Sequence, residues 1–213
     1  MTLAVARDEA FSFYYADALE ALEAAGAAIV YFSPLRDGEL PDCDGVYLGG
    51  GYPEVFAAGL EENAAMRASL AGAAAAGMPV YAECGGMVYL CRSLETDGRE
   101  RSMAGVLPLQ ARMTGRRQAL GYVEVTARRD SILFRQGETA RGHEFHWSQV
   151  DWLADSAAWD CASARAGGAR PEGFAAGNVL ASYVHINFAG NPAAARRFIE
   201  ACREAKGALT GAA

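Results

Sequence analysis

Short apolar runs alternate with longer segments of helical character through the first half of the chain, and this alternation constrains the fold more than any other feature. Short apolar runs predict buried strands, and apolar residues spaced by three or four positions predict helices. The predicted strands cover residues 3–6, 28–32, 46–48 and 79–83, and the predicted helices cover residues 13–25, 63–76 and 85–93, with another helical stretch opening at Pro53. Ser12 and Gly26 are the expected caps of the first helix. This order favours a parallel sheet with helices on both faces.

The second half of the chain has a different pattern, in which strand-like segments follow one another with few helices between them. We predict strands at residues 103–108, 120–127, 142–152 and 179–184, an irregular loop at residues 162–173, and a final helix at residues 193–206. Some of these strands are expected to add antiparallel pairs to the structure. The chain is therefore predicted to form one α/β domain over residues 2–206, followed by a flexible tail at residues 207–213.

Composition excludes several classes of protein. Hydrophobic residues make up 52% of the 213 residues, and the net charge of −7 comes with no basic block that would bind nucleic acid. Five cysteines, an odd number and none in a CxxC pair, argue against a disulfide scaffold or a zinc site and favour the cytoplasm. We expect no bound metal. Arg7, Asp8 and Glu9 stand where a signal peptide needs apolar residues, and no segment is apolar enough to predict a membrane span.

Cys84 stands in a turn that suits a nucleophile. The apolar run Val-Tyr-Ala at residues 80–82 leads into Glu83-Cys84-Gly85-Gly86 and then into a predicted helix. A sharp strand-to-helix turn exposes its central residue, and glycine neighbours allow a close backbone approach. The helix N-terminus favours a thiolate, and the amide of Gly85 could point toward an oxyanion. A buried structural cysteine remains the alternative, and it is the interpretation of the other four.

Three consecutive glycines, Gly49-Gly50-Gly51, follow another predicted strand and precede a helix. Backbone amides without side chains can hold an anion or a developing oxyanion. A tight turn with no ligand is equally consistent with this pattern. The spacing differs from the GxGxxG of dinucleotide-binding proteins.

Three histidines are available as bases for a cysteine nucleophile. His185 ends a strand-like run, and the carboxyl ends of parallel strands are where ligands meet an open α/β sheet. It therefore suits a Cys–His pair with Cys84, although a core histidine bonded to a carbonyl is the alternative. On a strand, His143 and His146 would face opposite sides, which argues against a shared metal. Glu144 could pair with His146 or line a cleft with it.

Five linked motifs resemble the C-terminal glutaminase domain of the cobyrinate a,c-diamide synthase family. They are AVARDEAFSFYY (residues 4–15), LGGGYPE (48–54), YAECGGMVYL (81–90), GHEFHWS (142–148) and SYVHINF (182–188). They spread over almost the whole chain in the order that the family has. Together they are far more specific than any single motif.

The resemblance implies the three-layer, flavodoxin-like fold of class I glutamine amidotransferases, with a mostly parallel sheet and antiparallel additions. It implies that Cys84 is the nucleophile and His185 its base, and that Gly50, Gly51 and Gly85 lie near the oxyanion hole. Many class I enzymes carry His-Pro-Glu, whose glutamate completes a triad; here the segment is His-Ile-Asn, so Asn187, a backbone carbonyl or a water is left to orient the histidine.

The resemblance also implies the partners. L-Glutamine would be the substrate, and the ammonia would amidate the a and c carboxylates of cobyrinate in cobalamin biosynthesis. ATP and Mg²⁺ would act in an N-terminal synthetase domain, which is absent from this chain. Because Lys206 is the only lysine, no GxxxxGK[ST] phosphate loop exists here, and any ATP site has to lie in another domain or chain.

Several alternatives stay open at this point. The acceptor could be hydrogenobyrinate or Ni-sirohydrochlorin, since their synthases would carry nearly the same glutaminase half. The domain could also be a non-catalytic regulatory module with a redox-sensitive Cys84, or a hydrolase or peptidase with the same elbow. Glutamine hydrolysis distinguishes these possibilities.

Overall fold

A six-stranded sheet forms the centre of the computed structural model, which describes residues 1–163 and 168–211. Its strand order is β15-β16-β6-β4-β1-β3, and all neighbours are parallel except the edge strand β15, which runs antiparallel to β16. The strands are β1 (Thr2–Ala6), β3 (Ala28–Phe32), β4 (Gly45–Leu48), β6 (Val80–Glu83), β15 (Phe174–Ala176) and β16 (Val179–Ser182). The predicted parallel α/β sheet is confirmed.

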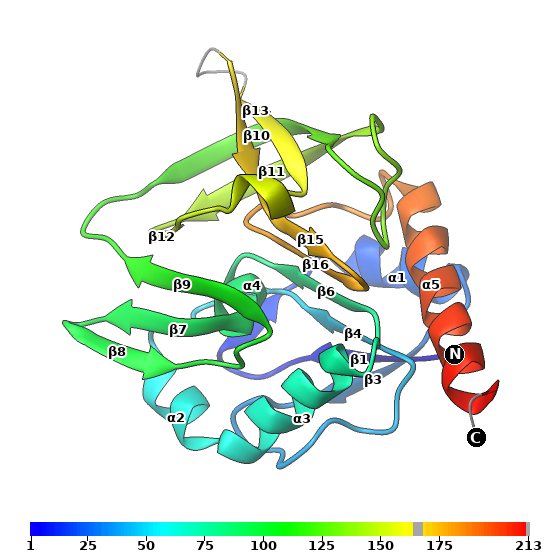
Figure 1. Ribbon diagram of the computed structural model, residues 1–213, viewed down its shortest axis with the longest axis horizontal. Helices are drawn as coiled ribbons and strands as arrows, with labels where there is room; N and C mark the ends of the chain where they lie inside the picture. Colours follow the sequence, from blue (N-terminus) through cyan, green and yellow to red (C-terminus); the bar gives the residue numbers. More distant parts are fainter. Residues whose placement is uncertain (164–167, 212–213) are drawn as a thin grey trace.

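Helices cover both faces of this sheet and make three layers (Figure 1). On one face lie α1 (Ala16–Ala24) and α5 (Pro192–Gly211), and on the other lie α2 (Ala57–Glu62), α3 (Ala64–Ala75) and α4 (Gly85–Leu90). Successive strand residues point to opposite faces, so Leu3 and Val5 enter the core under α1 and α5, whereas Ala4 enters the other core. This alternation explains why the central strands read as continuous apolar runs.

The chain between α4 and β15 forms two further sheets. An antiparallel sheet has the order β11-β10-β13-β14, and a mixed sheet has the order β12-β9-β7-β8. Their strands are β7 (Cys91–Thr96), β8 (Arg99–Ser102), β9 (Leu107–Met113), β10 (Ala119–Ala127), β11 (Thr139–His146), β12 (Ser148–Val150), β13 (Trp159–Ser163) and β14 (Ala169–Glu172); a short 3₁₀ helix spans Ala154–Ser156. The predicted antiparallel additions are therefore present, as sheets beside the central one and as β15 at its edge.

Some predicted boundaries were wrong. The first helix begins at Ala16, because β2 (Phe11–Phe13) pairs with β5 (Gly50–Gly51); Ser12 lies in that strand and caps nothing. Gly26 does follow the helix end, with a φ of 106° that suits glycine. The stretch at Pro53 starts as a turn, and the helix begins at Ala57.

In other segments, strand pairing with distant residues decides the structure, against the prediction from local sequence. The helix expected to reach residue 93 ends at Leu90, since Cys91 begins a strand that pairs with β9. Residues 103–106 are not a strand. The segment expected to be a loop at 162–173 instead contributes to β13 and β14, which pair with each other; residues 164–167 lie outside the described part of the chain.

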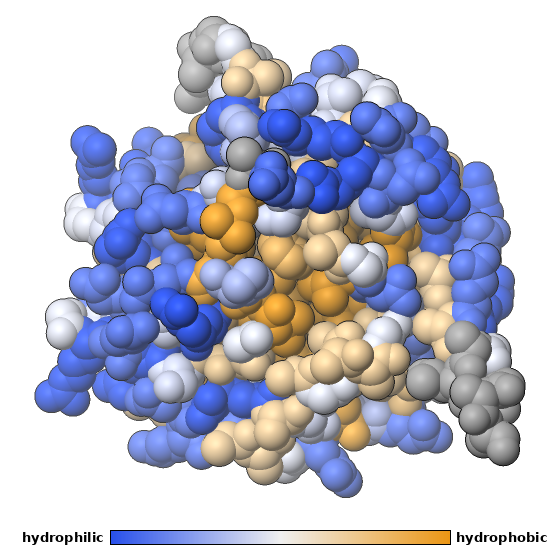
Figure 2. Space-filling model, viewed as in Figure 1, coloured by the Kyte–Doolittle hydropathy of each residue, from blue (hydrophilic) through white to orange (hydrophobic). Residues whose placement is uncertain are grey.

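Polar side chains frame an apolar area on the face seen in Figure 2. The lower part of this area overlies α3, whose sequence is rich in alanine. Asn63 caps that helix by accepting a hydrogen bond from the amide of Met66. Among the described residues, no helix is both long and apolar enough to cross a bilayer.

Candidate active site

Cys84 occupies a sharp turn between β6 and α4. Its backbone has φ 47° and ψ −105°, a conformation that residues other than glycine rarely adopt. Its amide donates to the carbonyl of Ser182 at 2.7 Å, which ties the turn to the neighbouring strand β16. A Cβ at Gly86 would lie 2.3 Å from the carbonyl oxygen of Leu48, so only glycine fits there. This is the strand–turn–helix arrangement that the sequence predicts around Cys84.

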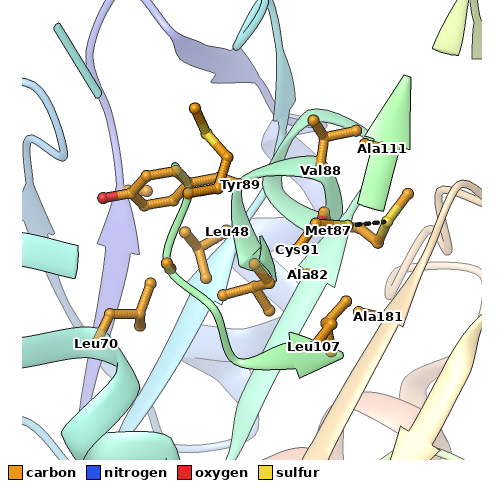
Figure 3. Packing of buried hydrophobic residues seen from close by; sticks show 14 of the residues in the cluster. Leu48, Leu70, Ala82, Met87, Val88, Tyr89, Cys91, Leu107, Ala111 and Ala181 are labelled. Atoms are coloured by element: carbon orange, nitrogen blue, oxygen red, sulfur yellow. Dashed lines mark hydrogen bonds between the residues drawn. The ribbon is translucent and has the colours of Figure 1, made fainter. Parts of the chain in front are cut away.

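The helix that follows Cys84 is buried along its whole length, which holds the strained turn in place. Side chains from the central sheet and from β9 pack around it, as Figure 3 shows for Leu48, Ala82, Leu107 and Ala111. The apolar run Met-Val-Tyr-Leu after the glycines therefore anchors the turn, whereas Cys84, which precedes the helix, is only partly buried.

The triglycine segment packs directly against the cysteine turn. A Cβ on Gly85 would lie 2.9 Å from the amide nitrogen of Gly51, and a Cβ on Gly50 would lie 2.7 Å from Cε1 of His185. The amide of Gly86 donates to the carbonyl of Gly49 at 3.0 Å. The structure thus brings together the predicted residues Gly50, Gly51, Gly85, Cys84 and His185.

His185 lies three residues beyond the end of β16 and is almost fully buried. Its imidazole lines the same cavity as Cys84, whose thiol donates to the carbonyl of Phe145 at 3.7 Å. The ring of Phe13 packs edge-on against the imidazole with centroids 5.0 Å apart. Burial by itself lowers the pKa of His185, but its interactions with Cys84 and Glu83 outweigh burial and raise the pKa to about 10. The imidazole can therefore hold the proton that the Cys84 thiol gives up.

Glu83 is the residue of this site that sequence reasoning missed. Its carboxylate is 2% exposed, and Oε2 lies 3.3 Å from Nδ1 of His185. Asn187, one of the groups expected to orient the histidine, points elsewhere: its amide donates to Asp17, and its oxygen accepts from the backbone of Ala189. The signal was available, because an acidic residue at the end of an apolar strand has to find partners.

The other two histidines have different surroundings. His143 exchanges two backbone hydrogen bonds with His185, and burial lowers the pKa of its side chain. His146 stacks on Tyr183 with ring centroids 3.7 Å apart, and its Nδ1 lies 2.8 Å from the carbonyl oxygen of Ser148. Burial lowers its pKa as well.

Glu144 is hydrogen-bonded to neither histidine. It is buried and forms an ion pair with Arg170 of β14 at 2.5 Å. Of the two possibilities that the sequence left open, His146 lines the cleft, and the hydrogen-bonded partner of Glu144 is an arginine. No cluster of three or more potential metal ligands occurs among residues 1–163 and 168–211.

A cavity of about 410 Å³ opens above Cys84. Gly50, Gly51 and Gly85 form part of its wall together with the two catalytic candidates, and its volume falls in the range of small-molecule sites. Exposed aromatic side chains stand at its mouth: Phe13, Tyr52, Phe145 and Trp147, between 43% and 59% exposed. A second cavity, of about 810 Å³, shares His143 and His185 with the first.

Residues 2–193 match the protein family described as the CobB/CobQ-like glutamine amidotransferase domain. The chain belongs to this family. It is 46% identical over 209 residues to the cobyrinate a,c-diamide synthase of Syntrophotalea carbinolica and 44% identical over 208 residues to that of Salmonella typhimurium. These alignments cover 94% and 95% of this chain but 45% of each relative, so the chain spans less than half of their length.

Solved structures confirm the class I amidotransferase fold of this family member. PurLQS from Thermotoga maritima superposes with a TM-score of 0.68 at 17% identity, covering 95% of this chain and 97% of the other. A glutamine amidotransferase from the same organism gives a TM-score of 0.57 at 14% identity, covering 98% and 85%. At such identities the likeness concerns the fold alone.

Proposed function

We propose that this domain is the glutaminase half of a cobyrinate a,c-diamide synthase, with Cys84 as nucleophile and His185 as base. The observation that carries the proposal is that these two residues line one cavity, beside glycine backbone. The identity of 44–46% to synthases of that name supports the reaction. A nucleophile beside an oriented base is the arrangement that covalent amide hydrolysis needs.

In the first half of the reaction, His185 takes the thiol proton and the Cys84 sulfur attacks the side-chain carbonyl carbon of L-glutamine. The carbonyl oxygen becomes an oxyanion, which the backbone amides of Gly50, Gly51 and Gly85 in the cavity wall would stabilise. His185 then gives its proton to the departing nitrogen. Ammonia leaves, and a γ-glutamyl thioester remains on Cys84.

In the second half, His185 takes a proton from water, whose oxygen attacks the thioester carbonyl. Collapse of this intermediate breaks the carbon–sulfur bond, returns the proton to Cys84 and releases glutamate. Because the nucleophilic thiol has to stay reduced through each cycle, a reducing compartment such as the cytoplasm suits this chemistry.

The ammonia would serve a synthetase with ATP and Mg²⁺, which activates the a and c carboxylates of a corrinoid acceptor. The single lysine of this chain, Lys206, leaves no phosphate loop of the GxxxxGK[ST] type in it, so we assign these ligands to a synthetase half outside this chain. The exposed aromatic residues at the cavity mouth offer that partner a docking surface, since apolar side chains in one patch favour protein contacts.

Amidation of cobyrinate with two nitrogen sources tests the proposal. With the synthetase half present, we expect wild-type protein to use either L-glutamine or an ammonium salt. Cys84→Ser should lose glutamine-dependent amidation and glutamate release but keep ammonia-dependent amidation, because the synthetase itself is untouched. Glutamine use by folded Cys84→Ser would refute the assignment of the nucleophile.

The same assay identifies the acceptor. Hydrogenobyrinate and Ni-sirohydrochlorin replace cobyrinate in parallel reactions supplied with ammonium salt, so that the result depends on the synthetase alone. Preference for either of them would contradict the cobyrinate assignment and leave the glutaminase chemistry intact. His185→Ala is expected to prevent thioester accumulation or turnover without unfolding the domain.

A further inference from the structure

We infer that Glu83 is the acidic positioning residue of this site, which holds His185 by Nδ1 and so directs Nε2 at the Cys84 thiol. The inference deepens the proposed function and rests on it for its catalytic meaning. Its basis is the geometry around one buried carboxylate, which stands directly before the nucleophile in the chain and beside the histidine in space.

The imidazole is held from two sides. Nδ1 lies 3.3 Å from Oε2 of Glu83, and the ring of Phe13 packs edge-on against the imidazole. Because a carboxylate accepts hydrogen bonds and donates none, Nδ1 carries the proton and Nε2 is the atom left to exchange a proton with the thiol. The edge of the ring formed by Cε1 and Nε2 faces Gly50, where a Cβ would lie 2.7 Å from Cε1 and 3.5 Å from Nε2.

The carboxylate itself is fixed by three donors besides His185. Tyr47 donates its hydroxyl to Oε2 at 2.8 Å, Tyr81 donates its hydroxyl to Oε1 at 2.6 Å, and the amide of Ile186 donates to Oε1 at 2.9 Å. Both tyrosines are buried and stack on each other. A buried carboxylate with four donors is rigid, and hydrogen bonds to a charged group are stronger than neutral ones.

The acid therefore reaches the histidine from a different place in the chain. In enzymes with His-Pro-Glu, the glutamate follows the histidine by two residues, where this chain has Asn187. Asn187 turns outward to Asp17. Here β6 supplies both the acid and the nucleophile, and its parallel pairing with β16, in which Ser182 lies opposite Glu83, places the histidine within reach of both.

Alkylation of Cys84 by iodoacetamide across a range of pH tests this role without requiring glutamine turnover. Loss of the charge in Glu83→Gln should lower the pKa of His185 and disfavour the thiolate–imidazolium pair. Alkylation at about pH 7 should slow roughly 10- to 100-fold, with the pH midpoint of the rate shifted upward. Peptide mass spectrometry isolates the signal of Cys84; burial raises the pKa of the other four thiols, to about 11 for Cys43 and about 12 for Cys91, Cys161 and Cys202.

The matched control is Glu172→Gln. Glu172 is also a buried carboxylate, and it accepts from the hydroxyl of Ser182 and the amide of Tyr183, but not from His185. We expect its alkylation profile to equal that of wild type. An unchanged profile in folded Glu83→Gln would overturn the inference, as would an equal shift in both variants, because such a shift would reflect general loosening of the core.

A second measurement uses wild-type protein and does not depend on whether Glu83→Gln folds. The chain has three histidines, so ¹⁵N spectra of its imidazoles are simple to assign. We expect the proton of neutral His185 on Nδ1; a proton on Nε2 would overturn the inference. If Cys84 alkylation depends on Glu83 but the complex with the synthetase half never hydrolyses glutamine, the proposed function fails and the positioning role stands.

Discussion

Replacement of Gly50 by alanine tests how closely the triglycine segment is fitted to the catalytic histidine. The new Cβ would lie 2.7 Å from Cε1 of His185, 3.5 Å from its Nε2 and 3.3 Å from Cβ of Phe13. Carbon atoms in contact prefer separations of about 3.5–4.0 Å, so the imidazole has to move by roughly 0.8 Å or more. The contact from Nδ1 to Glu83 is already 3.3 Å long and has little room to stretch.

Displacement on this scale should affect catalysis far more than folding. Misplacement of a catalytic group by about 1 Å can cost about 100-fold in rate, so we expect kcat for glutamine hydrolysis to fall by about that factor. The free energy of unfolding should fall by about 1–3 kcal/mol, the usual effect of an added methyl group in a packed site. The backbone amide of residue 50 is retained, so the loss reports on His185.

The assay is glutamate release by the complex with the synthetase half, measured together with thermal unfolding of the isolated domain. Gly72→Ala is the control, because it lies in α3 with open space around its Cα and should stabilise the helix by about 0.5–1 kcal/mol with unchanged kcat. Wild-type kcat in Gly50→Ala would contradict this prediction, because it would show that His185 does not need its observed place.

Three further predictions concern stability and association. Gly86→Ala should destabilise the domain by more than about 3 kcal/mol in chemical unfolding, since its Cβ would lie 2.3 Å from a backbone oxygen of Leu48; a loss below about 1 kcal/mol would show that the turn can relax. Burial raises the pKa of Glu172 to about 7 from 4.5, so the folded state binds the extra proton and the free energy of unfolding should fall by roughly 3 kcal/mol as pH rises through that window. Unfolding measurements across this pH range should show no such fall for Glu172→Gln. A pH dependence equal to that of wild type in this variant would show that Glu172 is not its cause. Tyr52→Asp should weaken binding of the synthetase half at least about tenfold in calorimetric titration, and unchanged affinity would place the interface elsewhere.

Local signals predicted the parts of the site that depend on backbone shape. Glycines after an apolar strand predicted the turn at Cys84, and the structure places it there with a positive φ. The triglycine and His185 each followed a strand of the same sheet, so their meeting follows from parallel topology. The catalytic roles of these residues stay predictions.

What sequence reasoning missed depends on distant pairing. Glu83 was predicted only as the end of a strand. Its four donors come from two tyrosines on β4 and β6 and from the segment after β16, and the sequence does not show that these segments meet. In the same way, Cys91 was assigned to a helix. Its partner strand β9 begins sixteen residues later, at Leu107, so the residues next to Cys91 in the sequence give no sign of the pairing. Local patterns cannot show which distant strand will pair.

The pairing of β6 with β16 gives Cys84 a use beyond chemistry. The thiol stands at the end of one strand and its histidine just past the end of the other, and the amide of Cys84 donates to Ser182 across the gap. Separation of these two strands, even briefly, would part the thiol from its base while the rest of the domain stays folded. The reactivity of one cysteine is therefore a built-in reporter of local opening at the middle of the sheet, and comparison with amide hydrogen exchange at β6 and β16 would calibrate it.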